Sequence, residues 1–339
     1  MENIDWKHLP FAYMKTDYNV RCYYREDKWG ELETTSSEFI PMHMAATCLH
    51  YGQEAFEGLK AFRGQDGKIR VFRWRENVKR MKDTAIGIKM APVPEELFQR
   101  AVFSAIRLNE RFVPPYGLGA SLYIRPLLIG TGAEVGVKPA KEYLFMVFVT
   151  PVGPYFKDGY KPVDVMICRS HDRAAPLGTG AFKVGGNYAA SLTSLEIAHQ
   201  QGFSTSLYLD AKEKKYIDEA GPANFFGIKN NTYITPESKS ILPSITNKSV
   251  MDLAKKIGLK VERRPVPVEE LTSFDEVGAC GTAAVITPIK KIVDPDLNII
   301  YEYCKDGNPG PLSTQLYNSI VAIQNGDAED PFQWVDIMD

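Results

Sequence analysis

The spacing of apolar and polar positions along the chain predicts short strands mixed irregularly with helices. Val78, Met81 and Ala85 recur at helical spacing and predict a helix over residues 76–88. Pro94, followed by two acids, predicts the start of a second helix with one apolar face. Further helices are predicted at 188–200, 247–257 and 312–324.

Runs of alternating or β-branched apolar residues predict the strands. They lie at 68–73, 121–129, 143–149, 163–168, 205–210, 216–219, 225–228, 232–235, 261–264 and 276–280. Helices and strands that do not alternate regularly favour an α+β fold over a repeated βαβ series. A stretch rich in proline and glycine predicts a linker at 153–163 between domains at 1–152 and 164–339.

Composition narrows the class of protein without choosing a function. The 339 residues correspond to about two domains of about 150 residues each. The 40 basic and 42 acidic residues leave a net charge of −2, so neither a nucleic-acid nor an anionic-membrane partner is predicted. The N-terminus lacks the apolar core of a secretory signal, and the densest apolar run, 143–149, is too short to span a bilayer. Five scattered cysteines without a CxxC pair favour the cytoplasm.

Several common catalytic motifs are absent from the sequence. It has no GxxxxGK[ST] phosphate loop, no HExxH zinc motif and no GxSxG nucleophile elbow. Gly130, Gly132 and Gly136 are similar to GxGxxG, but the third glycine is misplaced and Val-Lys-Pro follows it instead of a helix. The sequence therefore predicts neither a nucleotide site of these kinds nor a metal centre.

One lysine stands in an unusual setting. Lys183 lies among several glycines, which let the backbone approach a ligand closely, and between the apolar residues Phe182 and Val184. An arbitrary lysine is most often a surface charge. A lysine drawn against an apolar wall instead has a lowered pKa and can form an imine with an aldehyde.

Two adjacent acids end the strand predicted at 216–219. Side chains alternate between the two faces of a strand, so we expect only one of Asp218 and Glu219 to point inward. A solvated strand end is the ordinary alternative for such a pair.

Two segments could bind anions through backbone N–H groups. In the first, Ile245, Thr246 and Asn247 lead from a loop into a predicted helix, whose N-terminus attracts anions. Capping of that helix without a ligand is the commoner role. The second, residues 280–284, follows a strand and could supply N–H donors in a turn. A lysine, a carboxylate and two anion seats are together what pyridoxal 5'-phosphate requires.

At this point the chain resembles a known family, the branched-chain amino acid aminotransferases among the class IV pyridoxal-phosphate-dependent aminotransferases. The motifs that carry the resemblance stand in the family's order along nearly the whole chain. They are residues 50–58 (HYGQEAFEG), 72–81 (FRWRENVKRM), 123–126 (YIRP), 183–188 (KVGGNY), 219–224 (EAGPAN), 242–246 (LPSIT) and 281–284 (GTAA).

The resemblance implies a role for each cofactor-binding residue. Lys183 would form the Schiff base and move protons, and Glu219, not Asp218, would bind the pyridine nitrogen. Arg80 would hold the phosphate, although the sequence without the resemblance predicts an exposed helix residue there. The other cofactor-binding residues would be Tyr188, which would reach the phenolic oxygen, and Ile245, Thr246, Gly281 and Thr282 around the phosphate.

The resemblance also implies the substrate pocket. Aromatic and aliphatic side chains would hold a branched substrate, while Arg125 and tyrosine hydroxyls would hold the side-chain carboxylate of glutamate. The backbone of Ala283 would donate to the substrate α-carboxylate, and Val137 would come from a neighbouring subunit. The remaining pocket residues would be Tyr51, Phe56, Tyr123 and Tyr155.

The family implies a fold-type IV enzyme, with a smaller N-terminal α/β domain and a larger C-terminal domain of mixed β-barrel and helices. It would be a cytoplasmic homodimer that transfers the amino group of L-leucine, L-isoleucine or L-valine to 2-oxoglutarate, giving branched-chain 2-oxo acids and L-glutamate. A D-amino-acid aminotransferase of the same fold is the alternative.

Two positions depart from relatives. The redox CxxC of some eukaryotic members would fall on Ala284 and Thr287, so no thiol regulation by that pair is expected, and Cys280 is expected in the core. Pro222 stands where some relatives have threonine, which removes a hydroxyl and a backbone donor near the cofactor.

Overall fold

The computed structural model describes residues 4–154 and 159–338. The chain divides into two compact units, which are taken separately below. The residues of the first unit are 1–155, 182–185 and 322–339, and those of the second are 156–181 and 186–321.

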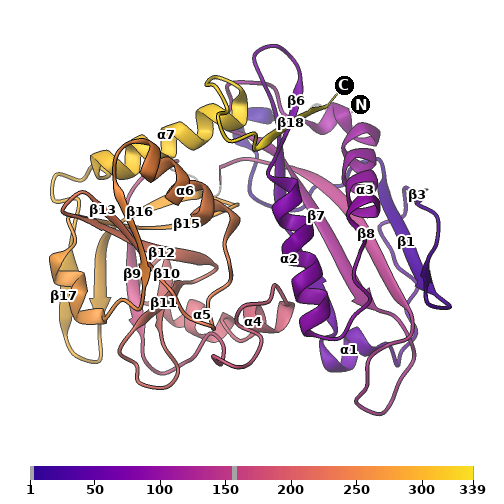
Figure 1. The fold of residues 1–339 in the computed structure, drawn as a ribbon, viewed down its shortest axis with the longest axis horizontal. Coiled ribbons are helices and arrows are strands. Elements are labelled where there is room, and N and C mark those ends of the chain that lie inside the picture. Colours follow the sequence, from indigo (N-terminus) through magenta and orange to yellow (C-terminus); the bar gives the residue numbers. More distant parts are fainter. Residues whose placement is uncertain (1–3, 155–158, 339) are drawn as a thin grey trace. The chain divides into compact units, whose positions relative to one another are not determined.

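The first unit is built on an antiparallel sheet that has nine strands within the described residues (Figure 1). Seven strands follow in the order β18-β6-β5-β7-β8-β1-β2, while β3 pairs with β1 and β4 pairs with β7. Their bounds are β1 (Asn19–Arg25), β2 (Lys28–Trp29), β3 (Glu33–Thr35), β4 (Glu54–Phe56), β5 (Leu59–Arg63), β6 (Ile69–Phe72), β7 (Ser121–Gly130), β8 (Tyr143–Val152) and β18 (Val335–Met338).

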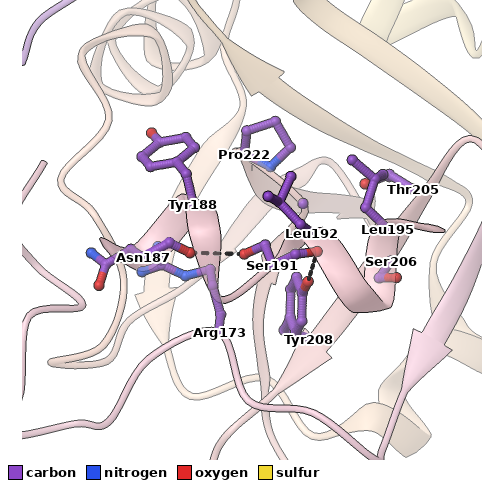
Figure 2. Close-up of a pocket in the computed structure, with 11 residues that line it drawn as sticks. Arg173, Asn187, Tyr188, Ser191, Leu192, Leu195, Thr205, Ser206, Tyr208 and Pro222 are labelled. Atoms are coloured by element: carbon purple, nitrogen blue, oxygen red, sulfur yellow. Dashed lines mark hydrogen bonds between the residues drawn. The ribbon is translucent and has the colours of Figure 1, made fainter. Parts of the chain in front are cut away.

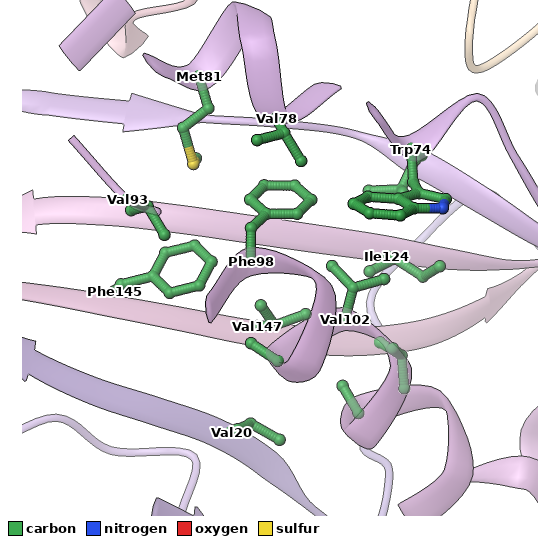
Figure 3. Packing of buried hydrophobic residues seen from close by; sticks show 14 of the residues in the cluster. Val20, Trp74, Val78, Met81, Val93, Phe98, Val102, Ile124, Phe145 and Val147 are labelled. Atoms are coloured by element: carbon green, nitrogen blue, oxygen red, sulfur yellow. The ribbon is translucent and has the colours of Figure 1, made fainter. Parts of the chain in front are cut away.

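Two amphipathic helices, α2 (Trp74–Gly87) and α3 (Glu95–Leu108), bury their apolar faces against one face of this sheet. Figure 3 shows Phe98 of α3 next to Phe145 of β8, where the two rings stack with centroids 5.8 Å apart. Alternate residues of β7, among them Leu122 and Ile124, enter this core. The residues between them therefore face the other side of the sheet. Shorter helices of the unit are η1 (Trp6–His8), α1 (Thr47–Tyr51) and η2 (Glu110–Phe112).

The second unit contains a closed barrel. Its strands follow in the order β11-β10-β9-β16-β15-β12-β13-β14, and an additional pairing between β11 and β12 closes the first six into a ring. Their bounds are β9 (Val163–Cys168), β10 (Thr205–Leu209), β11 (Ile217–Ala220), β12 (Ala223–Lys229), β13 (Thr232–Pro236), β14 (Lys260–Arg264), β15 (Glu276–Gly281), β16 (Val285–Asp294) and β17 (Ile299–Glu302), which pairs with β16.

The helices in the second half of the chain differ from the sequence prediction at one place. The single helix predicted at 188–200 is wrong, because two helices, α4 (Gly185–Ala189) and α5 (Leu192–Gln200), occupy that stretch. The Ser191 hydroxyl donates to the Asn187 carbonyl, and the Ser191 N–H turns to the carbonyl of Tyr188, so regular helical bonding is interrupted there. The other helices are α6 (Ile245–Lys256), η3 (Val268–Ser273) and α7 (Pro311–Asn325).

The α+β fold predicted from the sequence is confirmed by this mixture of sheets and helices. Strands β1 and β16 were not predicted, because charged residues such as Arg21 and Lys290 interrupt their apolar pattern. The shorter strands β2, β3, β4, β5, β17 and β18 were also missed. The domain limits at 1–152 and 164–339 stay a prediction. Within residues 4–154 and 159–338, no helix is both long and apolar enough to cross a membrane.

Candidate active site

The backbone around Lys183 is fixed by two hydrogen bonds within the first unit. The Lys183 N–H donates to the Thr84 hydroxyl of α2 at 3.1 Å, and the Lys183 carbonyl accepts from the Phe56 N–H at 3.1 Å. Phe182 packs on Gly87, where any Cβ would lie 2.3 Å from the Phe182 ring, so only glycine permits this approach. The lysine is therefore held by an element far from it in sequence.

The environment of Lys183 disfavours its charged form. Its amine lies 4.7 Å from the centroid of the Phe56 ring. Burial lowers the pKa of the amine to about 8, and the nearby positive charge of Arg80 acts in the same direction. Near neutral pH a fraction of the amine is thus unprotonated and nucleophilic, as the sequence predicted for this setting.

Arg80 is buried in α2 and forms an ion pair with Glu57. The guanidinium donates from Nε to Oε1 at 2.7 Å and from Nη2 to Oε2 at 2.8 Å. Glu57 is fully buried and also accepts from Asn77 at 2.7 Å. The exposed position that the helix pattern alone predicts for Arg80 is wrong, because Glu57 compensates its buried charge.

Three candidate pocket residues share the face of the first sheet that lies opposite α2 and α3. Arg125 and Tyr123 alternate with the core residues of β7, and Arg125 donates to the Tyr123 hydroxyl at 3.0 Å. The Arg125 guanidinium also lies 4.9 Å from the Phe56 ring. Its buried Nε has no hydrogen-bond acceptor among the described residues, which suits an arginine that binds a carboxylate from outside.

Two other predicted pocket residues of the first unit, Tyr51 and Val137, lie at its surface. Tyr51 ends α1, is 40 % exposed and donates its hydroxyl to the Val135 carbonyl. Val137 is 87 % exposed, as expected of a residue that would act on a neighbouring subunit. Tyr155 lies outside the described residues.

In the second unit, Asp218 and Glu219 are both buried, at 4 % and 2 % exposure. Both faces of β11 are therefore covered, and the solvated strand end that is the ordinary alternative for such a pair is wrong. Asp218 accepts from the Ser240 hydroxyl at 2.5 Å, and burial raises the pKa of its carboxyl group. A carboxyl group with a raised pKa is the weaker candidate for an ionised partner of a pyridine nitrogen.

Glu219 is surrounded by donors. Its Oε1 accepts from the Leu242 N–H at 2.6 Å and from the Asn224 amide at 3.2 Å. Its Oε2 lies 3.2 Å from Nε of the buried Arg173. Each of these groups stabilises a negative charge on Glu219, so the acid is arranged to act as a carboxylate.

The segment predicted to bind an anion lies at the N-terminus of α6. Ser244 caps the helix, since its hydroxyl accepts from the Asn247 N–H at 3.1 Å. The N–H groups of Ile245 and Thr246 belong to the first turn, which has no intrahelical acceptors for them. Such a turn can donate to a phosphate.

The second predicted donor turn joins β15 to β16. Gly281 pairs with Val285, so Thr282 and Ala283 lie in the tight loop between the two strands. Val285 has a φ of 64°, which is a strained conformation for a β-branched residue. Cys280 just before the turn is buried, and burial raises the pKa of its thiol to about 12, so it is the core thiol that the sequence predicted.

Tyr188 lines a small pocket of the second unit, about 130 Å³ in volume (Figure 2). Arg173, Leu192 and Pro222 line the same pocket, and Figure 2 shows Tyr188 and Pro222 on one side of it. Pro222 is thus placed beside the tyrosine expected to bind the cofactor's phenolic oxygen.

The candidate residues accordingly form two groups, one in each unit. The first contains Lys183, Arg80, Phe56, Tyr123 and Arg125. The second contains Glu219, Tyr188, Ile245, Thr246, Gly281, Thr282 and Ala283, and their roles stay predictions. Sequence reasoning missed Arg173 and Thr84, because a charged residue in a loop and a hydroxyl inside a helix give no local signal of a buried partner.

Comparison with known proteins identifies the family. Residues 54–292 match the family model "Amino-transferase class IV". A branched-chain-amino-acid aminotransferase of Helicobacter pylori strain J99 is 47% identical over 99% of this chain and 98% of its own length. The chain belongs to the class IV aminotransferases. Within them it belongs to the branched-chain-amino-acid group, as its motifs predicted.

Solved structures of this group share the fold. The Escherichia coli branched-chain amino acid aminotransferase superposes with a TM-score of 0.78 at 29% identity, covering 95% of this chain and 99% of that one. The T.th. branched-chain amino acid aminotransferase, complexed with N-(5'-phosphopyridoxyl)-L-glutamate, superposes with a TM-score of 0.76 at 25% identity, with the same coverage. The predicted fold-type IV architecture is therefore confirmed.

Proposed function

We propose that the protein is a branched-chain-amino-acid transaminase that uses pyridoxal 5'-phosphate. It transfers the amino group of L-leucine, L-isoleucine or L-valine to 2-oxoglutarate, and the products are the branched-chain 2-oxo acids and L-glutamate. The observation that carries this proposal is the Lys183 amine, held beside Phe56 with its pKa lowered to about 8, in a chain of this family. The relatives favour this reaction over that of a D-amino-acid aminotransferase.

Each unit, taken by itself, contains residues that suit the proposed cofactor. Lys183 would bind its aldehyde carbon. Glu219, stabilised by two hydrogen bonds and by the nearby Arg173 guanidinium, would keep the pyridine nitrogen protonated. The N-terminus of α6 and Thr282 would hold the phosphate, and so would Arg80, whose position is fixed by Glu57. Bound pyridoxal phosphate supplies an electron sink for the pair left behind when a Cα–H bond breaks.

Lys183 has a second task in each half of the reaction. With its amine free, Lys183 would accept the proton from the substrate α-carbon and would later donate it again. A lysine whose pKa is lowered toward the working pH is suited to both transfers. Phe56 desolvates the Lys183 amine and Arg80 repels its positive charge. Both effects therefore favour binding of the cofactor by the amine as well as proton transfer.

The pocket must accept both an aliphatic side chain and the carboxylate of glutamate. Burying an aliphatic side chain against Phe56 and Tyr123 stabilises the bound substrate by about 1.5–3 kcal/mol. Arg125, with its buried Nε and its bond to the Tyr123 hydroxyl, provides a charge-assisted site for the glutamate carboxylate. Backbone N–H groups of the Thr282–Ala283 turn bind the substrate α-carboxylate.

We also propose a cytoplasmic homodimer. All five cysteines are free thiols, which suits a reducing compartment. The surface of the first unit exposes apolar side chains, including Phe39 (83 %), Val135 (87 %) and Val137 (87 %), which a second copy would cover. Light scattering of the purified protein measures the assembly directly, and a monomeric enzyme that is active would exclude a role for the partner's Val137.

The test of function combines one variant with two substrates. The wild-type protein should bind pyridoxal phosphate with a visible absorption band and convert L-leucine with 2-oxoglutarate faster than D-alanine. Lys183→Ala should lose both the band and the turnover, whereas Lys255→Ala at an exposed position of α6 should retain them. Preference for D-alanine, or full turnover by Lys183→Ala, would refute the proposal.

A further inference from the structure

A chain of buried hydrogen bonds runs from Glu219 to a tyrosine that the proposed reaction does not use. Asn224 donates to Glu219 Oε1 at 3.2 Å, and Asn247 donates to the Asn224 Oδ1 at 3.3 Å. The Tyr233 hydroxyl donates to the Asn247 Oδ1 at 2.7 Å. Asn224 and Asn247 are each 6 % exposed, and Tyr233 is fully buried.

The direction of every bond in this chain follows from its chemistry. The Leu242 carbonyl and an ionised Glu219 can only accept, so the Asn224 amide must turn its NH2 group toward both, and it donates to the carbonyl at 3.3 Å. Its oxygen therefore faces Asn247, which must present its own NH2 group. The Asn247 oxygen is then left for Tyr233, whose hydroxyl must donate.

The same chain reaches the anion seat. Asn247 stands in the first turn of α6, directly after Ile245 and Thr246, and its backbone N–H is bound by the Ser244 cap. Its NH2 group also donates to the Thr235 hydroxyl of β13 at 2.9 Å. One side chain thus connects the first turn of α6 to β13 and, through Asn224, to Glu219.

We propose that Asn224, Asn247 and Tyr233 form a positioning relay that fixes the Glu219 carboxylate relative to the first turn of α6. This inference rests on the proposed function, in which Glu219 would bind the pyridine nitrogen and that turn would bind the phosphate of one cofactor. The three residues touch no substrate. They act by holding the two binding groups at a constant spacing and by keeping a donor aimed at the Glu219 carboxylate.

Removing the Tyr233 hydroxyl distinguishes an effect of the relay from an effect of ordinary core packing. Tyr233→Phe keeps the ring but leaves the Asn247 oxygen without its donor, so the Asn247 amide can reorient and release Asn224. Tyr303 is a matched control in the same unit, because it is also buried and donates its hydroxyl to the Leu271 carbonyl at 2.6 Å, outside the relay. Both variants remove one hydroxyl from a buried tyrosine, and that of Tyr233 also contacts the Cys280 thiol.

The experiment titrates the apoenzymes with pyridoxal phosphate and follows the visible absorption band. Tyr233→Phe should bind the cofactor about 3–10-fold more weakly than Tyr303→Phe, while the two lose a similar amount of thermal stability. Equal cofactor affinities of the two variants would overturn the relay and leave the proposed function standing. A wild-type protein that binds no pyridoxal phosphate would overturn both.

A double-mutant cycle shows whether the effect passes through Glu219. In a Glu219→Gln background there is no carboxylate for the relay to position. Tyr233→Phe should therefore weaken cofactor binding by less than about 2-fold there. An undiminished effect in that background would show that Tyr233 acts on cofactor binding by another route and would overturn the relay.

Discussion

The surroundings of Lys183 and Glu219 act on the charges of these two groups in opposite directions. Lys183 faces an aromatic ring and lies near a second positive charge, so its charged form is destabilised. Glu219 accepts two hydrogen bonds and lies beside an arginine, so its charged form is stabilised. The first unit thereby favours the neutral amine of Lys183, and the second unit favours the negative charge of Glu219, although burial desolvates both groups.

The largest effect is expected where the stabilised charge is removed. Glu219→Gln keeps the shape of the side chain but cannot hold a pyridinium nitrogen, so kcat/KM for L-leucine should fall about 10²–10⁴-fold. Asp218→Asn is the matched control on the same strand. Because burial already raises the pKa of the Asp218 carboxyl group, an amide there should cost less than about 10-fold. Equal losses in steady-state kinetics would contradict the assignment of roles to these neighbours.

The sequence alone could predict part of this contrast. The apolar flanks of Lys183 and its glycines are local features, and the charge of Glu219 was visible as one of two candidates. Arg80 was assigned only through the resemblance, because its buried partner Glu57 stands 23 positions away. The donors around Glu219 could not be found, since Leu242 contributes a backbone N–H and Arg173 lies in a loop without periodic pattern.

In the fold, too, features set by neighbouring residues could be predicted, whereas features set by distant residues could not. The apolar faces of α2 and α3 were predicted closely, because their spacing repeats within one helix. The closure of the barrel by β11 and β12 could not be predicted, because it depends on strand order and not on any single segment. The break between α4 and α5 was also missed, since it depends on the bond from the Ser191 hydroxyl to the Asn187 carbonyl.

The second prediction concerns the ion pair behind the destabilised lysine. Glu57→Gln leaves the Arg80 guanidinium buried without its counter-charge, so the free energy of unfolding should fall by about 3 kcal/mol. Since the charge of Glu57 raises the Lys183 pKa, the variant should also lower that pKa further. Denaturant unfolding and the pH profile of kcat/KM measure the two effects.

An exposed ion pair of the same unit provides the control. Glu110 lies 3.8 Å from Arg63 and its side chain is 61% exposed, so Glu110→Gln should change stability by less than about 0.5 kcal/mol. If Glu110→Gln and Glu57→Gln unfolded at the same denaturant concentration, burial would not be what gives the inner pair its importance.

The third prediction follows the charge of Lys183 through pH. The amine has a pKa of about 8 in the folded chain and about 10.5 when unfolded, so the unfolded chain binds more protons between these values. The stability of the apoenzyme relative to Lys183→Met should therefore rise from pH 8 to about 10.5, by on the order of 2–3 kcal/mol. Below pH 8 the charged amine bears its full desolvation cost, and Lys183→Met should be the more stable protein.

Denaturant unfolding of the two apoproteins at several pH values measures this difference. Lys60 is also buried with its pKa lowered to about 8, but it is present in both proteins and cancels. Lys255→Met, at an exposed position, should differ from the wild type by the same amount at every pH. A constant difference between wild type and Lys183→Met would mean that water reaches the amine freely.

The smallest effect is expected in the turn of the second unit whose backbone N–H groups are proposed to bind the substrate α-carboxylate. Val285 ends the turn that contains Thr282 and Ala283, and its φ of 64° costs roughly 1–2 kcal/mol in a residue with a side chain. Val285→Ala retains this strain, whereas Val285→Gly removes it at the expense of about 0.5–1 kcal/mol of chain entropy. The Val285→Gly variant should therefore be as stable as Val285→Ala, or more stable by up to about 1 kcal/mol.

The neighbouring Ile286 provides the control, because it is buried and its φ is not positive. There the alanine variant should be more stable than the glycine variant by a similar amount. Unfolding of the four variants tests the order, and the same preference at both positions would mean that the turn is unstrained.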